Sequence, residues 1–204
     1  MASTSEIGHA KNVANFQDLI EFVTAYGATY NPSKNSLKLP QLIALKASAD
    51  ATLADVITKN TNYNNKVNER ITAFSGLKSL STRLVNALQT TDATTETIGN
   101  AKTFNRKMQG KKASSSQTPT DPNTPAPNTI STSQQSYDQL IQHLAGLTSI
   151  LEAETSYTPN ETDLQVATIQ AKIADLSAKN TAVATAYTSI SNSRIARNET
   201  LYTS

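Results

Sequence analysis

Residues 16–32 of the chain have the sequence FQDLIEFVTAYGATYNP, and residues 137–159 have the sequence YDQLIQHLAGLTSILEAETSYTP. In both stretches apolar residues recur at helical spacing and are followed by a Tyr-x-Pro turn. Apolar positions match at an offset of 121 before the turn and at an offset of 127 from the turn onward. The pattern therefore predicts a duplicated helical hairpin, 16–74 and 137–201, with six residues added in the second copy between Leu147 and Tyr157. The matched positions of the first helix are Phe16, Leu19, Ile20, Val23 and Tyr26, which align with Tyr137, Leu140, Ile141, Leu144 and Leu147.

The ends of the helices follow from glycine, proline and capping residues. The first helix is expected over 13–26, closed by Gly27, and the long second helix should begin between Ser36 and Pro40. In the second copy, TDLQ at 162–165 has the sequence of a capping box, so that helix is expected to start at Thr162.

The long helix of each copy has a heptad-like stripe that includes polar residues. Asn60 and Asn180 are predicted either to fix the packing register or to lie at a wet edge of the bundle, and the wet edge is favoured. The stripe also includes Arg70, Arg194 and Arg197, which are expected to form a polar clasp between helices, with Glu69 and Glu199 as candidate partners. The predicted stripes are Leu42, Lys46, Ala49, Leu53, Val56, Asn60, Tyr63, Val67, Arg70 and Phe74, and Ile169, Ile173, Leu176, Asn180, Val183, Tyr187, Ile190, Arg194, Arg197 and Leu201.

Only the first half continues beyond its hairpin. An apolar stripe from Leu77 to Leu88 either extends the long helix or follows a break at Gly76, and Asp92 is the predicted N-cap of a helix over 93–109. The expected organisation is a first half over 1–112 with hairpin 13–74 and extra helices 77–109, a flexible Pro/Ser/Thr-rich linker over 113–135, and a second hairpin over 136–204. We expect both halves to pack as one composite bundle.

Composition indicates an all-α protein. Of 204 residues, 37% are hydrophobic and 5% aromatic, with no Trp and only six Gly, which suits helices that bury one stripe each. The predicted fold is an elongated antiparallel helical bundle of two repeated hairpins plus one or two extra helices.

No apolar run approaches the roughly 18 residues of a membrane span, and no signal peptide is visible. A cytoplasmic protein is therefore expected, although a mature secreted chain would have the same start.

The main charge cluster is Lys102, Arg106, Lys107, Lys111 and Lys112. Such a group can bind nucleic acid or another polyanion, but a solvated helix end that complements the helix dipole is the favoured interpretation.

His143 is expected to be an exposed helix residue, and no motif predicts catalytic, cofactor-binding or metal-binding residues. The absence of Cys excludes disulfides and cysteine nucleophiles. The two Tyr-x-Pro turns are interpreted as structural rather than as a ligand site.

The segments YGATYNP, VNER, TRLVNAL, FNRKMQGKK, SYDQLI and YTPNE together resemble an uncharacterised duplicated helical-bundle family of flavobacteria and related bacteria. The resemblance implies the two-copy helical fold and a bacterial origin, with no activity, cofactor or site residues to transfer.

Three functional hypotheses follow. The leading one is a non-enzymatic helical scaffold or protein-interaction module, acting by self-association or with an unknown protein partner. The second is polyanion binding through 102–112, and the third, least favoured because no apolar hairpin is present, is a membrane-acting bundle.

Overall fold

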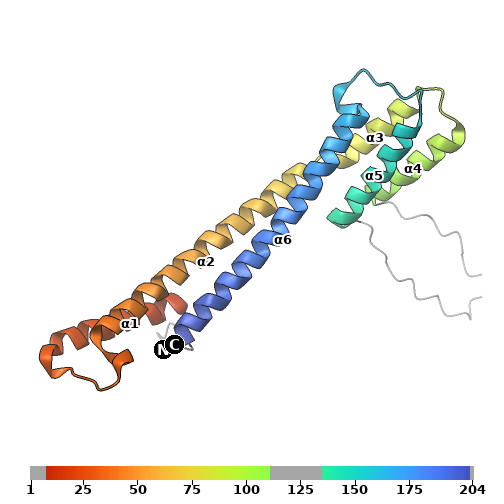
Figure 1. Ribbon diagram of the computed structural model, residues 1–204. Helices are drawn as coiled ribbons and strands as arrows, with labels where there is room; N and C mark the ends of the chain where they lie inside the picture. The colour runs from red at the N-terminus through yellow and green to blue at the C-terminus, as the bar shows by residue number, and fades with distance from the viewer. Residues whose placement is uncertain (1–7, 111–134, 203–204) are drawn as a thin grey trace, which may run out of the picture. The chain divides into compact units, whose positions relative to one another are not determined.

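The computed structural model describes residues 8–110 and 135–202, and all regular structure in these ranges is helical. The first half contains α1 (His9–Tyr26), α2 (Leu39–Phe74), α3 (Leu77–Leu88) and α4 (Thr95–Gln109), and the second contains α5 (Tyr137–Ala153) and α6 (Val166–Tyr202) (Figure 1). Short 3₁₀ helices lie at Gly27–Thr29, Asn35–Leu37 and Thr162–Leu164. The all-α prediction is confirmed. Apart from Gln135, the predicted linker lies outside the described residues.

Three glycines mark helix boundaries because their backbone has a positive φ that other residues rarely adopt. Gly27 ends α1 with φ 55°, Gly76 separates α2 from α3 with φ 78°, and Gly110 ends α4 with φ 75°. The apolar stripe after Phe74 is therefore a separate helix. The predicted cap at Asp92 is wrong: the hydroxyl of Thr94 accepts from the Thr97 N–H, and α4 begins at Thr95.

The two Tyr-x-Pro turns make the same hydrogen bonds. The Tyr30 hydroxyl donates to the Leu37 carbonyl at 2.6 Å, and the Tyr157 hydroxyl donates to the Leu164 carbonyl at 2.9 Å. In each turn a 3₁₀ helix precedes the long helix, which is why α6 begins at Val166 and not at Thr162. The predicted capping box is therefore wrong, because Thr162 lies within the 3₁₀ helix and makes no side-chain cap.

The chain divides into two compact units, and each unit combines residues from both halves of the sequence. Unit 1 contains the described residues of Met1–Val67 and Val183–Ser204, and unit 2 contains Asn68–Ala182. The boundary falls within α2 and within α6, so both long helices contribute to both units.

Unit 2 contains the larger apolar core. Helices α3, α4 and α5 pack together there, with the start of α6 and the end of α2 (Figure 1). Burying these side chains removes apolar area from water, the main favourable contribution to folding. The fully buried large side chains of this core include Leu84, Leu88, Met108, Leu144, Leu147, Leu151, Ile169 and Leu176.

Unit 1 has a thin core. Ile20 and Val23 of α1 pack with Leu42 of α2, and Phe16 lies partly buried against them. Segments of α2 and α6 run antiparallel, since Asp55 bonds Ser193 at 2.6 Å and the ring of Tyr63 contacts that of Tyr187, with centroids 5.9 Å apart.

The inner stripe of α6 departs from the predicted heptad in unit 1. Ala186 and Ser193 are 4% and 7% exposed, whereas the predicted members Tyr187 and Arg194 are exposed. In this unit the buried side of α6 is the side that packs on α2, where the Ser193 hydroxyl donates to Asp55.

Candidate functional site

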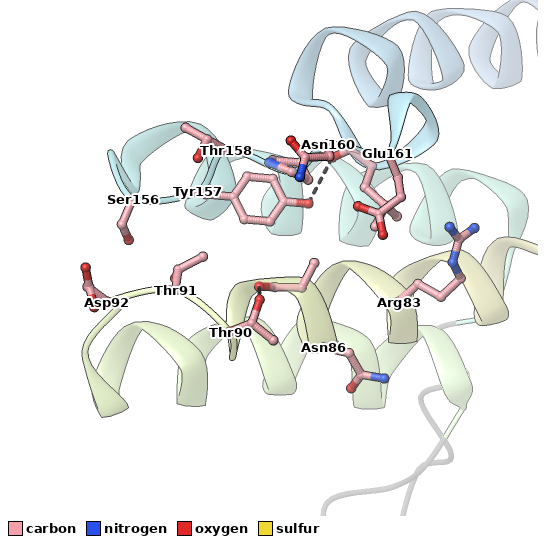
Figure 2. Close-up of a pocket in the computed structure, with 13 residues that line it drawn as sticks. Arg83, Asn86, Thr90, Thr91, Asp92, Ser156, Tyr157, Thr158, Asn160 and Glu161 are labelled. Carbon is pink, nitrogen blue, oxygen red and sulfur yellow. Dashed lines mark hydrogen bonds between the residues drawn. The ribbon is translucent and has the colours of Figure 1, made fainter.

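A groove of about 600 Å³ lies in unit 2 between α3 and the segment that precedes α6 (Figure 2). Residues from the C-terminal half of α3 form one wall, and the Tyr-x-Pro turn forms the other. Most of its lining groups are polar. The lining residues are Arg83, Asn86, Ala87, Thr90, Thr91, Asp92, Ser156, Tyr157, Thr158, Pro159, Asn160, Glu161 and Leu164.

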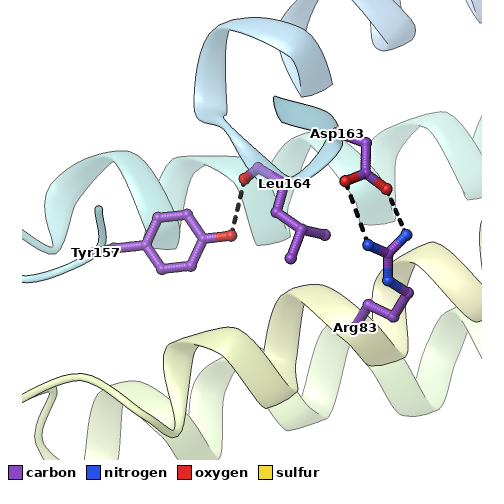
Figure 3. A network of polar contacts seen from close by, with 4 residues as sticks. All are labelled: Arg83, Tyr157, Asp163 and Leu164. Carbon is purple, nitrogen blue, oxygen red and sulfur yellow. Dashed lines mark hydrogen bonds and ion pairs between the residues drawn. The ribbon is translucent and has the colours of Figure 1, made fainter. Parts of the chain in front are cut away.

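Tyr157 is the aromatic side chain of this groove and is 7% exposed. Burial raises the pKa of its hydroxyl to about 12, and the nearby charges of Glu161 and Asp163 add to this shift. The hydroxyl therefore stays protonated and donates to the Leu164 carbonyl (Figure 3). Its role is to hold the turn, because a neutral phenol already committed as a donor cannot serve as a proton acceptor at neutral pH.

Arg83 of α3 forms a two-pronged ion pair with Asp163, which lies in the 3₁₀ helix before α6 (Figure 3). The hydrogen bond and charge of Asp163 raise the pKa of Arg83, and the hydrogen bond from Arg83 lowers the pKa of Asp163. Both side chains are about half exposed, so water screens the pair and its contribution to stability is small. The pair ties the turn to α3.

Three hydroxyl groups of the groove donate hydrogen bonds to nearby backbone carbonyls or to a carboxylate. Thr90 donates to the Ala87 carbonyl at 2.7 Å, Thr91 to the Leu88 carbonyl at 2.8 Å, and Ser156 to Glu154 at 2.6 Å. The bond from Ser156 keeps its hydroxyl on a carboxylate and lowers the pKa of Glu154. No group of three His, Asp or Glu within 8–110 and 135–202 is placed to hold a metal ion.

A polar clasp of six residues joins the end of α2 to α5 and α6 within unit 2. Arg70 donates to Asn180 at 3.0 Å and lies 4.1 Å from the ring centroid of Tyr137. Asn180 donates in turn to Asp138 at 2.7 Å, and Lys179 pairs with Glu69 at 3.0 Å. Glu69 was predicted as a candidate partner of Arg70, and in the structure it pairs with Lys179.

The other predicted polar-stripe residues lie elsewhere. Asn60 and Arg194 are exposed, so neither belongs to a buried stripe, and Arg197 is half-buried and bonds the side chain of its neighbour Asn198 at 2.9 Å. His143, predicted to be exposed, is 5% exposed, because α4 covers that face of α5 and brings Phe104 beside the imidazole.

The basic cluster is described only in part. Lys102 and Arg106 are exposed on α4, Lys107 lies 5.5 Å from the ring centroid of Phe104, and Lys111 and Lys112 lie outside the described residues. Phe104 packs against the backbone of Gly146, so its ring is engaged within the fold.

Two matched positions are exposed on α1 but not on α5. Tyr26 is 62% exposed, whereas its counterpart Leu147 is fully buried. Leu19 is 50% exposed and its counterpart Leu140 is only partly so, packed against the unit 2 core. Helices α3 and α4 contact α5 in unit 2, and α1 has no such cover among the described residues.

No protein-family model matches this chain, and neither the curated proteins nor the solved structures give a match. Function is therefore inferred from the geometry of the chain itself. None of the described helices has the length and apolar character needed to cross a membrane.

The sequence predicted Arg70 and Asn180 as polar residues of the long helices but did not predict the groove. Arg83 and Asp163 are 80 positions apart, and nothing in the sequence indicated that they would pair. The available signal was the recurring Tyr-x-Pro turn, which the sequence analysis interpreted as structural and which forms one wall of the groove. Nothing in the sequence indicated that α3 would form the other wall.

Proposed function

We propose that the protein is a non-enzymatic helical interaction module. The observation that supports this most directly is the number of large apolar side chains exposed in unit 1. On α1, Phe22 is 65% exposed, and on α2, Ile57 is 68% exposed. Burial of exposed apolar side chains is the main driving force of protein association, and most of the large ones exposed among the described residues belong to unit 1. The other members in unit 1 are Leu19, Tyr26, Leu37, Ile43, Tyr187, Ile195 and Tyr202.

The chemistry of the groove supports a non-catalytic role. Tyr157 and Arg83 are committed to the turn, and Ser156 is bonded to a carboxylate with no imidazole beside it. Nucleophilic catalysis needs a base that takes the proton from the nucleophile, and a low-pKa carboxylate does this poorly at neutral pH.

Polyanion binding through Lys102, Arg106 and Lys107 has weaker support. Nucleic-acid binding commonly adds aromatic stacking to basic contacts, and Phe104 is half-buried between Lys107 and Gly146.

The test combines mass measurement with capture. Multi-angle light scattering of the full chain at several concentrations should give masses that rise above the monomer value of 21.9 kDa, or tagged chain should capture a defined protein. The variant Ile57→Glu removes one exposed apolar side chain without touching the core, and it should weaken the self-association or the capture. A strict monomer that captures no protein would contradict the proposal.

A further inference from the structure

A second cavity, of about 340 Å³, lies in unit 2 between the start of α3 and the start of α6. We call it the α3–α6 cavity. The ion pair of Arg83 and Asp163 lines it (Figure 3). Its volume is within the range of small-molecule pockets, about 300–1,000 Å³, so it is large enough for a small organic ligand.

Three apolar side chains of the unit 2 core line the α3–α6 cavity. Leu77 and Ile169 are 3% and 1% exposed, and Leu80 is partly buried against the same core. The methylene stems of Arg83 and Lys172, which also line the cavity, add apolar surface. This part of the lining suits a hydrocarbon chain, because removing apolar surface from water is favourable.

The charged residues of the cavity are two cations and one carboxylate. Arg83 is paired with Asp163, which leaves the ammonium group of Lys172. Lys172 is partly buried and has no ion pair or hydrogen bond with any residue of 8–110 and 135–202. The lining therefore has one net positive charge, on a group that would gain a charge-assisted hydrogen bond from an anion.

Two hydroxyl groups of the lining are available as further donors. The side chains of Ser79 and Thr168 make no hydrogen bond within the part of the chain that the structure describes. Ser75, by contrast, donates to the Thr72 carbonyl at 2.6 Å. A ligand that accepts hydrogen bonds at one end and is apolar at the other thus matches both parts of the lining.

We infer that the α3–α6 cavity binds an amphiphilic monocarboxylate, with its carboxylate beside Lys172 and its hydrocarbon chain against Leu77, Leu80 and Ile169. One negative charge balances the net charge of the lining, whereas a dianion such as a phosphate monoester leaves an excess charge in a partly apolar site. This inference goes beyond the proposed interaction module and does not depend on it.

The probe for this site is octanoate, titrated into the full chain and followed by two-dimensional amide NMR spectra. Saturable shifts should concentrate in the first turns of α3 and α6. Acetate lacks the hydrocarbon chain and 1-octanol lacks the charge, so each should bind at least about tenfold more weakly than octanoate. Inorganic phosphate should also bind more weakly.

Four variants locate the ligand. Lys172→Met removes the charge but keeps an unbranched side chain, and it should raise the octanoate dissociation constant by about tenfold. Lys172→Arg keeps the charge and should restore binding. Ser79→Leu adds bulk at a residue that lines the cavity and should block binding. The matched control is Lys102→Met, the same change at an exposed lysine of α4 outside the cavity, which should leave the dissociation constant unchanged.

The outcomes separate this inference from the proposed function. It is overturned by the absence of saturable shifts up to about 10 mM octanoate, or by a dissociation constant that Lys172→Met leaves unchanged. Binding of 1-octanol or phosphate as tight as that of octanoate would overturn the ligand class. None of these results affects the interaction module, which light scattering and capture test separately.

Discussion

The hairpins of α1–α2 and α5–α6 share a sequence pattern and a turn but differ in surroundings. Tyr30 and Tyr157 make the same hydrogen bond, yet Leu37 is 46% exposed and its counterpart Leu164 is 4% exposed. The difference arises in the residues that follow each hairpin. Only the first copy continues into α3 and α4, and these helices pack on the second copy in unit 2. Some positions of the repeated pattern are thus buried in unit 2 and exposed in unit 1, as Leu147 and its counterpart Tyr26 are.

Truncation of matched side chains should give the largest contrast. Leu147→Ala removes a fully buried side chain and should lower the free energy of unfolding by about 2–5 kcal/mol. Tyr26→Ala, at the matched position in α1, should change it by about 0.5 kcal/mol or less in the monomer, because Tyr26 is 62% exposed. Urea titrations followed by circular dichroism measure both. Equal losses of stability in the two variants would show that Leu147 and Tyr26 lie in similar environments.

Glycine substitutions should give the next largest effect. A Cβ built on Gly146 would lie 2.4 Å from a ring carbon of Phe104, so Gly146→Ala forces that ring to move and should cost about 1–3 kcal/mol. The matched residue of α1 is already an alanine, Ala25, and is exposed.

Gly99→Ala is the control for this substitution. It lies within α4 with open space around it, and it should instead stabilise by about 0.5–1 kcal/mol through helix propensity. A stabilising Gly146→Ala would contradict the tight contact between α4 and α5.

The two turn tyrosines should respond unequally to loss of their hydroxyls. Tyr157→Phe leaves the buried Leu164 carbonyl without its partner and should cost about 1–2 kcal/mol, whereas Tyr30→Phe, in a turn open to water, should cost less than about 1 kcal/mol. Thermal and urea unfolding at neutral pH measure the difference.

Tyr157 also predicts a dependence on alkaline pH. Its pKa rises from 10.0 to about 12 on folding, so its stabilising contribution is complete below pH 10 and is lost as the pH rises from 10 to 12. In that window the unfolded phenol ionises while the folded one keeps its proton. Tyr157→Phe should therefore lose less stability than the wild type between pH 10 and pH 12. Parallel pH curves would contradict the burial of this hydroxyl.

The sequence predicted those features that depend on local pattern. The helical class, the end of α1 at Gly27 and the start of α2 followed from periodicity, glycine and proline. The boundaries at Thr94 and Val166 did not, because several hydroxyl and acidic residues near each end are chemically able to cap a helix and only the tertiary fold selects one. The one-position shift of the α6 stripe and the burial of His143 likewise depend on which helix packs there.

The smallest expected effect concerns the ion pair that is present at one turn only. Asp163 pairs with Arg83, but its counterpart in the first turn is Ser36, and α1 and α2 offer no equivalent of α3 there. Because Arg83 holds the pKa of Asp163 below its ordinary value of 3.8, the pair stabilises unit 2 above that pH and is lost as the pH falls through the lowered pKa.

Asp163→Asn should give a slight loss of stability at neutral pH that shrinks under acid and at high salt, since both groups are exposed and screened. Ser36→Asp creates the matched carboxylate without an arginine. It should therefore give no gain in stability, and no salt-dependent contribution, of the kind that an ion pair gives. If Asp163→Asn instead destabilises as much as Leu147→Ala does, the ion pair and not apolar packing is what distinguishes the second turn from the first.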